Sequence, residues 1–91
     1  MKALRVVVAG RVQGVGYRAW TEAAARRRGL AGWVRNRLDG SVEALLAGEE
    51  AALDAMLEAM RRGPPAARVD DLTVEDAEAP AAPGFEVRPT R

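Results

Sequence analysis

The sequence predicts a small α+β protein in which two helices cover one face of a β-sheet. Its 91 residues suffice for a single domain, 1–91. Segments with β-branched or alternating apolar residues and segments with helical periodicity follow one another in the order β-α-β-β-α-β, with a short final strand. Turns containing glycine or proline separate them. This order is that of the split β-α-β, or ferredoxin-like, sandwich, with an antiparallel or mixed sheet.

The first predicted strand, Leu4–Ala9, is nearly all apolar and mostly β-branched. Such a run is typical of a central strand buried on both faces. A glycine-rich loop follows, and then Ala19–Arg28 has the composition of a helix. Trp20, Ala23 and Ala24 stand at i, i+3 and i+4, so we expect them to form its buried stripe.

A hairpin is predicted next, with strands Leu30–Asn36 and Ser41–Ala47. The Asp-Gly pair in the intervening Arg37–Gly40 segment is a strong turn signal. In the second of these strands, Val42, Ala44 and Leu46 fall on one side of the strand, and Ser41, Glu43 and Leu45 on the other.

The clearest helix is Glu49–Arg62, whose apolar residues repeat at helical spacing: Leu53, Met56, Leu57 and Met60. The strand Ala67–Glu75 comes after it, with an expected bulge near Asp70–Asp71, where the apolar phase slips. Adjacent aspartates on a strand point to opposite faces, which favours a solvated edge over a metal site. Phe85–Arg88 is short enough for a closing edge strand.

The loop between the first strand and the first helix is where we expect the chemistry. It reads Gly10-Arg11-Val12-Gln13-Gly14-Val15-Gly16-Tyr17-Arg18. Glycines let the backbone turn through positive φ, and successive N–H groups next to a helix N-terminus can hold an anion. The Arg18 guanidinium can bind two oxygens of the same anion. The simpler alternative is a tight turn with a solvated arginine.

Composition limits the chemistry further. The chain has no cysteine and no histidine, so neither a thiolate nor an imidazole can act as nucleophile or base. The formal net charge of +1 does not argue for a nucleic-acid partner. The sequence has no long apolar run, and we expect a cytoplasmic protein without a membrane segment.

Two motifs at fixed positions resemble the acylphosphatase family. The first is the complete Gly10–Arg18 loop. The second is Gly32-Trp33-Val34-Arg35-Asn36 followed by Gly40-Ser41-Val42-Glu43. The similarity runs from Leu4 to Arg88 and implies an acylphosphatase-like domain over the whole chain.

The resemblance implies an enzyme that hydrolyses acyl phosphates to a carboxylate and inorganic phosphate. Arg18 corresponds to the phosphate-binding arginine of the family and Asn36 to the asparagine that holds the attacking water. The implied phosphate-binding residues are Arg11, Val12, Gln13, Gly14, Val15, Gly16, Tyr17 and Arg18. No metal or cofactor is implied, and we expect a monomer that inorganic phosphate inhibits as a product. Arg37, beside Asn36, departs from the small polar residue common there and could affect substrate access.

Two other functions are alternatives to this one. An RNA-binding module on the same fold needs several exposed aromatics on its sheet, and the chain has two Trp, one Tyr and one Phe in all. A phosphate-sensing domain, or an acylphosphatase-like domain of a larger carbamoyl-transfer enzyme, would use the same loop. Turnover of an acyl phosphate by the chain distinguishes enzyme from sensor.

Overall fold

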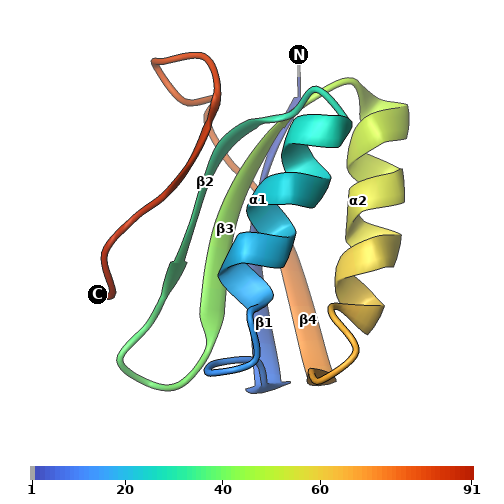
Figure 1. Cartoon of the computed structure of the whole chain (residues 1–91). Helices are drawn as coiled ribbons and strands as arrows, with labels where there is room; N and C mark the ends of the chain where they lie inside the picture. Colours follow the sequence, from blue (N-terminus) through green and yellow to red (C-terminus); the bar gives the residue numbers. More distant parts are fainter. Residues whose placement is uncertain (1) are drawn as a thin grey trace.

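The chain forms one five-stranded sheet with both helices on the same face (Figure 1). This computed structural model describes residues 2–91. The elements in chain order are β1 (Lys2–Arg11), α1 (Tyr17–Arg27), β2 (Ala31–Asn36), β3 (Val42–Gly48), α2 (Glu50–Arg62), β4 (Arg68–Asp76) and β5 (Phe85–Val87). The strand order is β4-β1-β3-β2-β5, and all pairs are antiparallel except β2–β5. The predicted split β-α-β order with a closing strand is confirmed.

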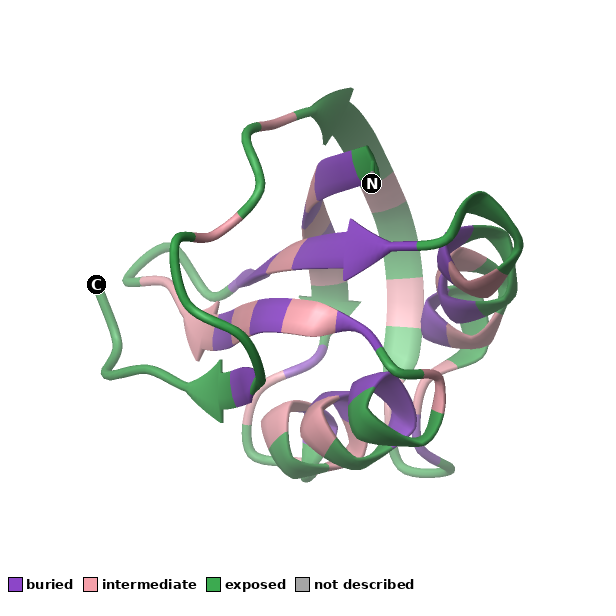
Figure 2. Ribbon diagram, turned by 90° about the horizontal axis from the view of Figure 1, so that it is seen from above, coloured by how far each residue is buried: buried purple, intermediate pink, exposed green. Residues whose placement is uncertain are grey.

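The apolar core lies between the sheet and the two helices, where Figure 2 shows the buried residues facing one another. The sheet contributes the inward residues of its central strands, and α2 contributes the stripe predicted for it. These residues are Val6, Val8, Val42, Ala44, Leu46, Leu53, Met56 and Met60, all at most 1 % exposed. Leu57, the fourth member of the predicted stripe, is half-buried at the edge of this core.

The expectation that the first strand is buried on both faces was wrong. β1 is central in order, between β4 and β3, but the helices cover only one side of it. Val6 and Val8 are buried, whereas Arg5 and Val7 on the open side are half-buried. A run of apolar residues indicates a central position in the sheet, but it does not indicate whether helices cover both faces of the strand.

The predicted stripe of α1 was only partly correct: Ala24 is buried, but the helix begins earlier than expected, at Tyr17. Its buried residues are Tyr17, Thr21, Ala24 and Ala25, spaced i, i+4, i+7 and i+8. Trp20 is half-buried and Ala23 is exposed. The Tyr17 hydroxyl donates to Met60 O of α2 at 2.7 Å, and Thr21 Oγ1 donates to Tyr17 O at 2.8 Å. These two bonds satisfy the hydroxyl groups of both buried residues.

The expected bulge is present where β1 pairs with β4. The register passes from Ala9↔Asp71 to Gly10↔Val69, so Asp70 is the extra residue. Gly10 has φ +129°, and a Cβ there would lie 2.3 Å from Arg68 O. The close approach of the two strands therefore requires glycine at this position.

The open face of the sheet carries a buried carboxylate between two arginines. Glu43 on β3 is 3 % exposed and accepts hydrogen bonds from Arg5 and, at 2.7 Å, from Arg35 Nε. Arg5 also donates to Glu75 at 2.7 Å. Burial opposes ionisation of Glu43, but the hydrogen bonds from Arg35 and Arg5 outweigh it and lower the pKa of the carboxyl.

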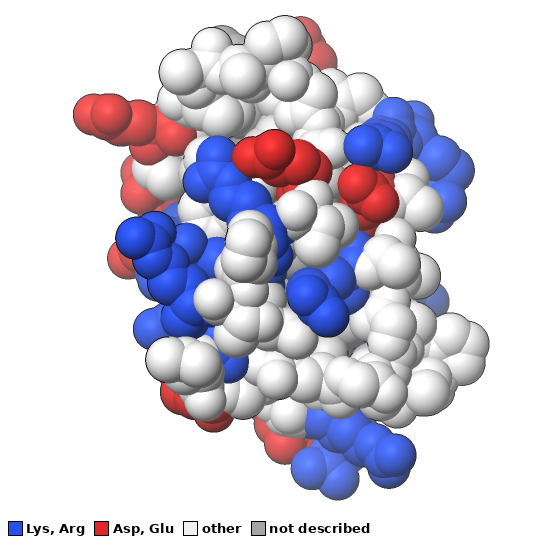
Figure 3. Space-filling model, turned by 60° about the vertical axis from the view of Figure 1, so that its left-hand side comes forward, with Lys and Arg blue, Asp and Glu red and all other residues white. Residues whose placement is uncertain are grey.

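Basic and acidic side chains both lie on the face that Figure 3 brings forward, and the formal net charge of the chain is +1. Among residues 2–91, no helix is both long and apolar enough to span a bilayer.

Candidate functional site

The loop after β1 forms a concave run of backbone that ends at the N-terminus of α1. Gly14 and Gly16 have φ of +74° and +78°, and a Cβ at either would meet nothing within 4 Å. The glycines are therefore needed for the backbone turn and not for space. Gly16 is the N-cap of α1, and the first turn of the helix contains no acidic residue. Helix geometry leaves the N–H groups of that turn without intrahelical partners, so they can bind an anion.

Arg18 and Asn36 line one cleft of about 320 Å³ together with this loop. Arg18 follows the first residue of α1, and Asn36 is the last residue of β2. The full lining is Val12, Gly14, Gly16, Tyr17, Arg18, Ala19, Glu22, Asn36 and Val87. The structure therefore brings together the two side chains that the sequence selected, from elements that are separate in the chain.

Neither of these two side chains is fully satisfied. Arg18 is half-buried and makes no hydrogen bond or ion pair with any residue in the range 2–91. Asn36 Oδ1 is the one buried side-chain polar atom in the same range that lacks a hydrogen-bond partner. Buried polar groups are almost always paired, so an unpaired one beside a cleft requires an explanation.

Not all of the predicted phosphate-binding loop reaches the cleft. Val12, Gly14, Gly16 and Tyr17 line it, as does Arg18, but the remaining loop residues, Arg11, Gln13 and Val15, do not. Arg11 is exposed and pairs with Arg68 in the sheet. Val15 packs against the edge of the core. Gln13 donates instead to two carbonyl oxygens of the β2–β3 turn.

Three residues of the cleft were missed from the sequence: Ala19, Glu22 and Val87. Glu22 lies four residues after Arg18 and so on the same face of α1, a signal that helical periodicity offered. Its carboxylate forms an ion pair with Arg26 at 3.1 Å. Val87 reaches the cleft because β5 pairs parallel to β2, with Val34 opposite Val87. No local pattern in the sequence indicates that pairing.

The environment of the cleft and of the neighbouring turn shifts the pKa of two ionisable groups, Tyr17 and Asp39. Burial raises the pKa of the Tyr17 hydroxyl, which therefore stays neutral. In the neighbouring turn, hydrogen bonds from the Ser41 hydroxyl and backbone N–H lower the pKa of Asp39. Arg37, whose side chain could have entered the site, lies 3.9 Å from Asp39 at its closest approach. Among residues 2–91, Arg18 is the cation that lines the cleft without a hydrogen-bond or ion-pair partner.

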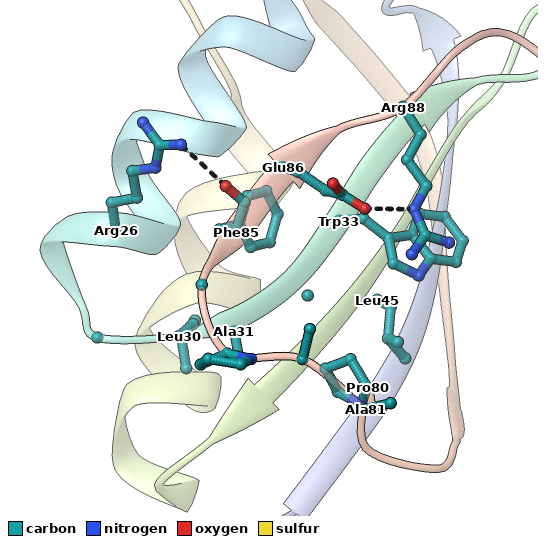
Figure 4. Close-up of a pocket in the computed structure, with 15 residues that line it drawn as sticks. Arg26, Leu30, Ala31, Trp33, Leu45, Pro80, Ala81, Phe85, Glu86 and Arg88 are labelled. Atoms are coloured by element: carbon teal, nitrogen blue, oxygen red, sulfur yellow. Dashed lines mark hydrogen bonds and ion pairs between the residues drawn. The ribbon is translucent and has the colours of Figure 1, made fainter.

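A second cleft, of about 930 Å³, lies under the segment that leads into β5 (Figure 4). Its walls are mostly apolar, with Leu30, Leu45 and Phe85 among them. Its two arginines already have partners, since Arg26 donates to Phe85 O at 2.9 Å and Arg88 to Glu86 at 2.8 Å. None of the residues assigned from the sequence to catalysis or phosphate binding lines this cleft, although Gly32 and Trp33 of the second motif do. The smaller cleft is therefore the candidate active site.

The comparisons with known proteins agree on one family. Residues 4–87 match the acylphosphatase family. The chain is 60 % identical over 90 residues to an acylphosphatase of Rhodospirillum rubrum, with 99 % of each chain covered. It is 54 % identical over 90 residues to an acylphosphatase of Acidiphilium cryptum, with the same coverage.

Solved structures give the same result. The crystal structure of acylphosphatase from Bacillus subtilis matches with a TM-score of 0.91 and 42 % identity, covering 97 % of this chain and 99 % of that one. Full-length HypF in its phosphate- and nucleotide-bound form matches with a TM-score of 0.89 and 25 % identity, but this covers only 12 % of HypF. Given the match to the family over 4–87 and relatives of similar length at 54–60 % identity, the chain belongs to the acylphosphatase family.

Proposed function

We propose that this acylphosphatase hydrolyses the carboxyl–phosphate bond of acyl phosphates in the smaller cleft, with Arg18 and Asn36 as its catalytic side chains. The observation that carries this assignment is the meeting, in one cleft, of a free arginine, a helix N-terminus and an asparagine whose amide oxygen is unpaired. Each has a capacity for binding that the folded protein itself leaves unused.

The phosphate group would lie on the backbone N–H groups of the loop and of the first turn of α1. Arg18 would contact two of its non-bridging oxygens and balance the charge that develops as the bond breaks. Phosphoryl transfer depends mainly on such positioning and charge stabilisation. Asn36, on the neighbouring strand, would hold a water in line with the leaving oxygen.

The reaction proceeds without a proton donor on the protein. The leaving group is a carboxylate, whose conjugate acid has a pKa of about 4, so it departs unprotonated near neutral pH. The Tyr17 hydroxyl is occupied in its bond to Met60 O. Glu22, the carboxylate in the lining of the cleft, is paired with Arg26. With no free base among the lining residues, the proton of the water would pass to a phosphate oxygen.

The first experiment measures inorganic phosphate released from benzoyl phosphate, with an enzyme-free control. We expect a much higher kcat/KM for this substrate than for an alkyl phosphate, because an alkoxide leaves poorly without an acid. Equal kcat/KM values for the two substrates would show that the protein provides a proton donor. Phosphate release no greater than in the enzyme-free control would refute the proposed hydrolase activity.

The same assay tests the binding site through its product. Inorganic phosphate should inhibit competitively, because it occupies the same loop as the substrate. Sodium chloride at matched ionic strength should inhibit much less, since chloride lacks the tetrahedral oxygens that the loop and Arg18 bind. Equal inhibition by the two salts would show that phosphate inhibits only by screening charge and does not bind in the cleft.

We also propose that the protein acts as a monomer, because a single chain supplies both Arg18 and Asn36 and the proposed chemistry requires no residue from a second copy. Light scattering after gel filtration tests this, and a dimer at assay concentration would contradict it. The cytoplasmic location expected from the sequence stays a prediction that cell fractionation tests.

A further inference from the structure

The side chain of Gln13 links the phosphate-binding loop to the turn that follows Asn36. Its amide nitrogen donates to Arg37 O at 2.9 Å and to Ser41 O at 3.0 Å. These two carbonyls stand at the neck of the β2–β3 turn. Each also accepts a backbone N–H: that of Gly40 bonds to Arg37 O, and that of Arg37 bonds to Ser41 O. One amide therefore joins two segments, the phosphate-binding loop and the β2–β3 turn, through carbonyls that are 24 and 28 residues distant from Gln13 in the chain.

The two segments joined in this way carry the two halves of the proposed site. Gln13 directly precedes Gly14, which lines the cleft on the loop side. Arg37 directly follows Asn36, which lines it on the strand side and forms the last β2–β3 pair with Val42. Among the described residues, Gln13 is the one member of the 11–16 loop whose side chain hydrogen-bonds to the β2–β3 turn.

We propose that Gln13 is a positioning residue: its amide fixes the distance between the phosphate-binding loop and Asn36. The inference rests on the proposed function, since it needs a phosphate on the loop and a water at Asn36. In-line attack tolerates little displacement, and a shift of about 1 Å can cost a factor of roughly 10² in rate. Glutamine suits the task because a single nitrogen carries two N–H donors, one for each carbonyl.

Removing the amide should change the rate more than the fold. Arg37 O and Ser41 O each keep a backbone N–H partner inside the turn, so neither becomes an orphaned acceptor. Gln13→Met keeps the length of the side chain and has no donor. Gln13→Asn keeps the amide and is one methylene too short to reach both carbonyls. Leu38→Ala is the matched control. Leu38 belongs to the same turn and is 88 % exposed to solvent, so truncating it removes little packing.

We expect Gln13→Met and Gln13→Asn to lower kcat by roughly 10-fold to 100-fold while the Kd of inorganic phosphate stays within about twofold of wild type. Leu38→Ala should change neither quantity. Circular dichroism at the assay temperature confirms that each variant is folded, and either Gln13 variant suffices for the test. An unchanged kcat would overturn the proposal. So would a rise in phosphate Kd by the same factor as the fall in kcat, because Gln13 would then act on the loop alone.

A double-mutant cycle with Asn36→Ala, run at high enzyme concentration, identifies the route of the effect. If Gln13 acts through Asn36, Gln13→Met should have little further effect on the slow Asn36→Ala enzyme. If the two losses multiply in full, Gln13 acts elsewhere and the positioning role is wrong, although the proposed function stands. If Asn36→Ala itself turns over at the wild-type rate, the attacking water is held by another group, and the role assigned to Asn36 and the positioning role of Gln13 both fail.

Discussion

Asn36→Ala should make the enzyme slower and the fold more stable. The side chain is assigned to the attacking water and not to the phosphate, so kcat should fall by about 10²-fold, the scale for loss of one positioned polar group. The Kd of inorganic phosphate should stay near wild type. An activity loss of this kind is usually accompanied by unchanged or reduced stability, and the geometry of Asn36 predicts the reverse.

The magnitude follows from the unpaired oxygen. A buried acceptor without a partner costs about 1–3 kcal/mol, and among residues 2–91 no protein group pairs with Asn36 Oδ1, so this cost applies when the attacking water is not bound there. Truncation to alanine removes this cost and loses the burial of one side-chain carbon, about 0.8 kcal/mol. The net gain in the free energy of unfolding is about 1 kcal/mol. For a domain of this size that raises Tm by roughly 4–8 °C.

Calorimetric melting of the phosphate-free protein, beside phosphate-release kinetics on the same samples, measures both effects. Asn36→Asp is the isosteric comparison: it places a carboxylate next to the bound phosphate and should weaken phosphate binding, which Asn36→Ala should not. An alanine variant that melts below wild type would show that Oδ1 has a partner in solution. An alanine variant with wild-type kcat would show that the water is held by another group.

Three further predictions concern the charges. Arg18→Ala should weaken phosphate binding and lower kcat together, and Arg18→Lys should rescue neither, because an ammonium cannot contact two oxygens as a fork; phosphate calorimetry in which the lysine variant binds like wild type would contradict this. The lowered pKa of Glu43 means that its contribution to stability is present above the ordinary value of 4.5 and is lost as pH falls through the lower folded-state pKa. Glu43→Gln should therefore lower Tm at pH 7, by an amount equivalent to about 2 kcal/mol or more since two arginines lose their partner, and the difference from wild type should shrink in acid; a Tm difference that does not change with pH would refute the linkage. Finally, treatment with a chelator should leave the rate unchanged, because Arg18 and the loop supply the charge balance, and loss of activity that returns with Mg²⁺ or Zn²⁺ would overturn that account.

Local signals in the sequence were sufficient for the element order, whereas the two proposed catalytic side chains were selected through the resemblance to the family. Helical spacing identified the stripe of α2, and the apolar phase slip located the bulge at Asp70. Arg18 and Asn36 were selected because each stands at a fixed place in a long motif that resembles the family, and the structure places both in one cleft. The stripe of α1 was partly misplaced because the helix was expected to begin at Ala19, which left Tyr17 outside it, and because the Thr21 hydroxyl, satisfied by Tyr17 O, is polar.

Features that depend on register between distant segments could not be predicted. Val87 enters the cleft through the parallel pairing of β5 with β2, and nothing in the three residues of β5 specifies their partner. The direction of the Gln13 side chain depends on two carbonyls that the chain places only after the hairpin has formed. In the sequence, Gln13 is one more member of a glycine-rich loop.

The buried phenol of Tyr17 makes the protein an optical probe of its own opening. It is the single tyrosine of the chain, is 1 % exposed, and joins the start of α1 to the end of α2 through Met60 O. Burial raises its pKa above the ordinary 10.0, so its contribution to stability is complete below that pH and is lost as pH rises toward the folded-state pKa. After a rapid jump to alkaline pH, phenolate absorbance should appear only as fast as the two helices separate. The absorbance trace therefore times the release of α1, the helix whose N-terminus forms the phosphate site, without any added label.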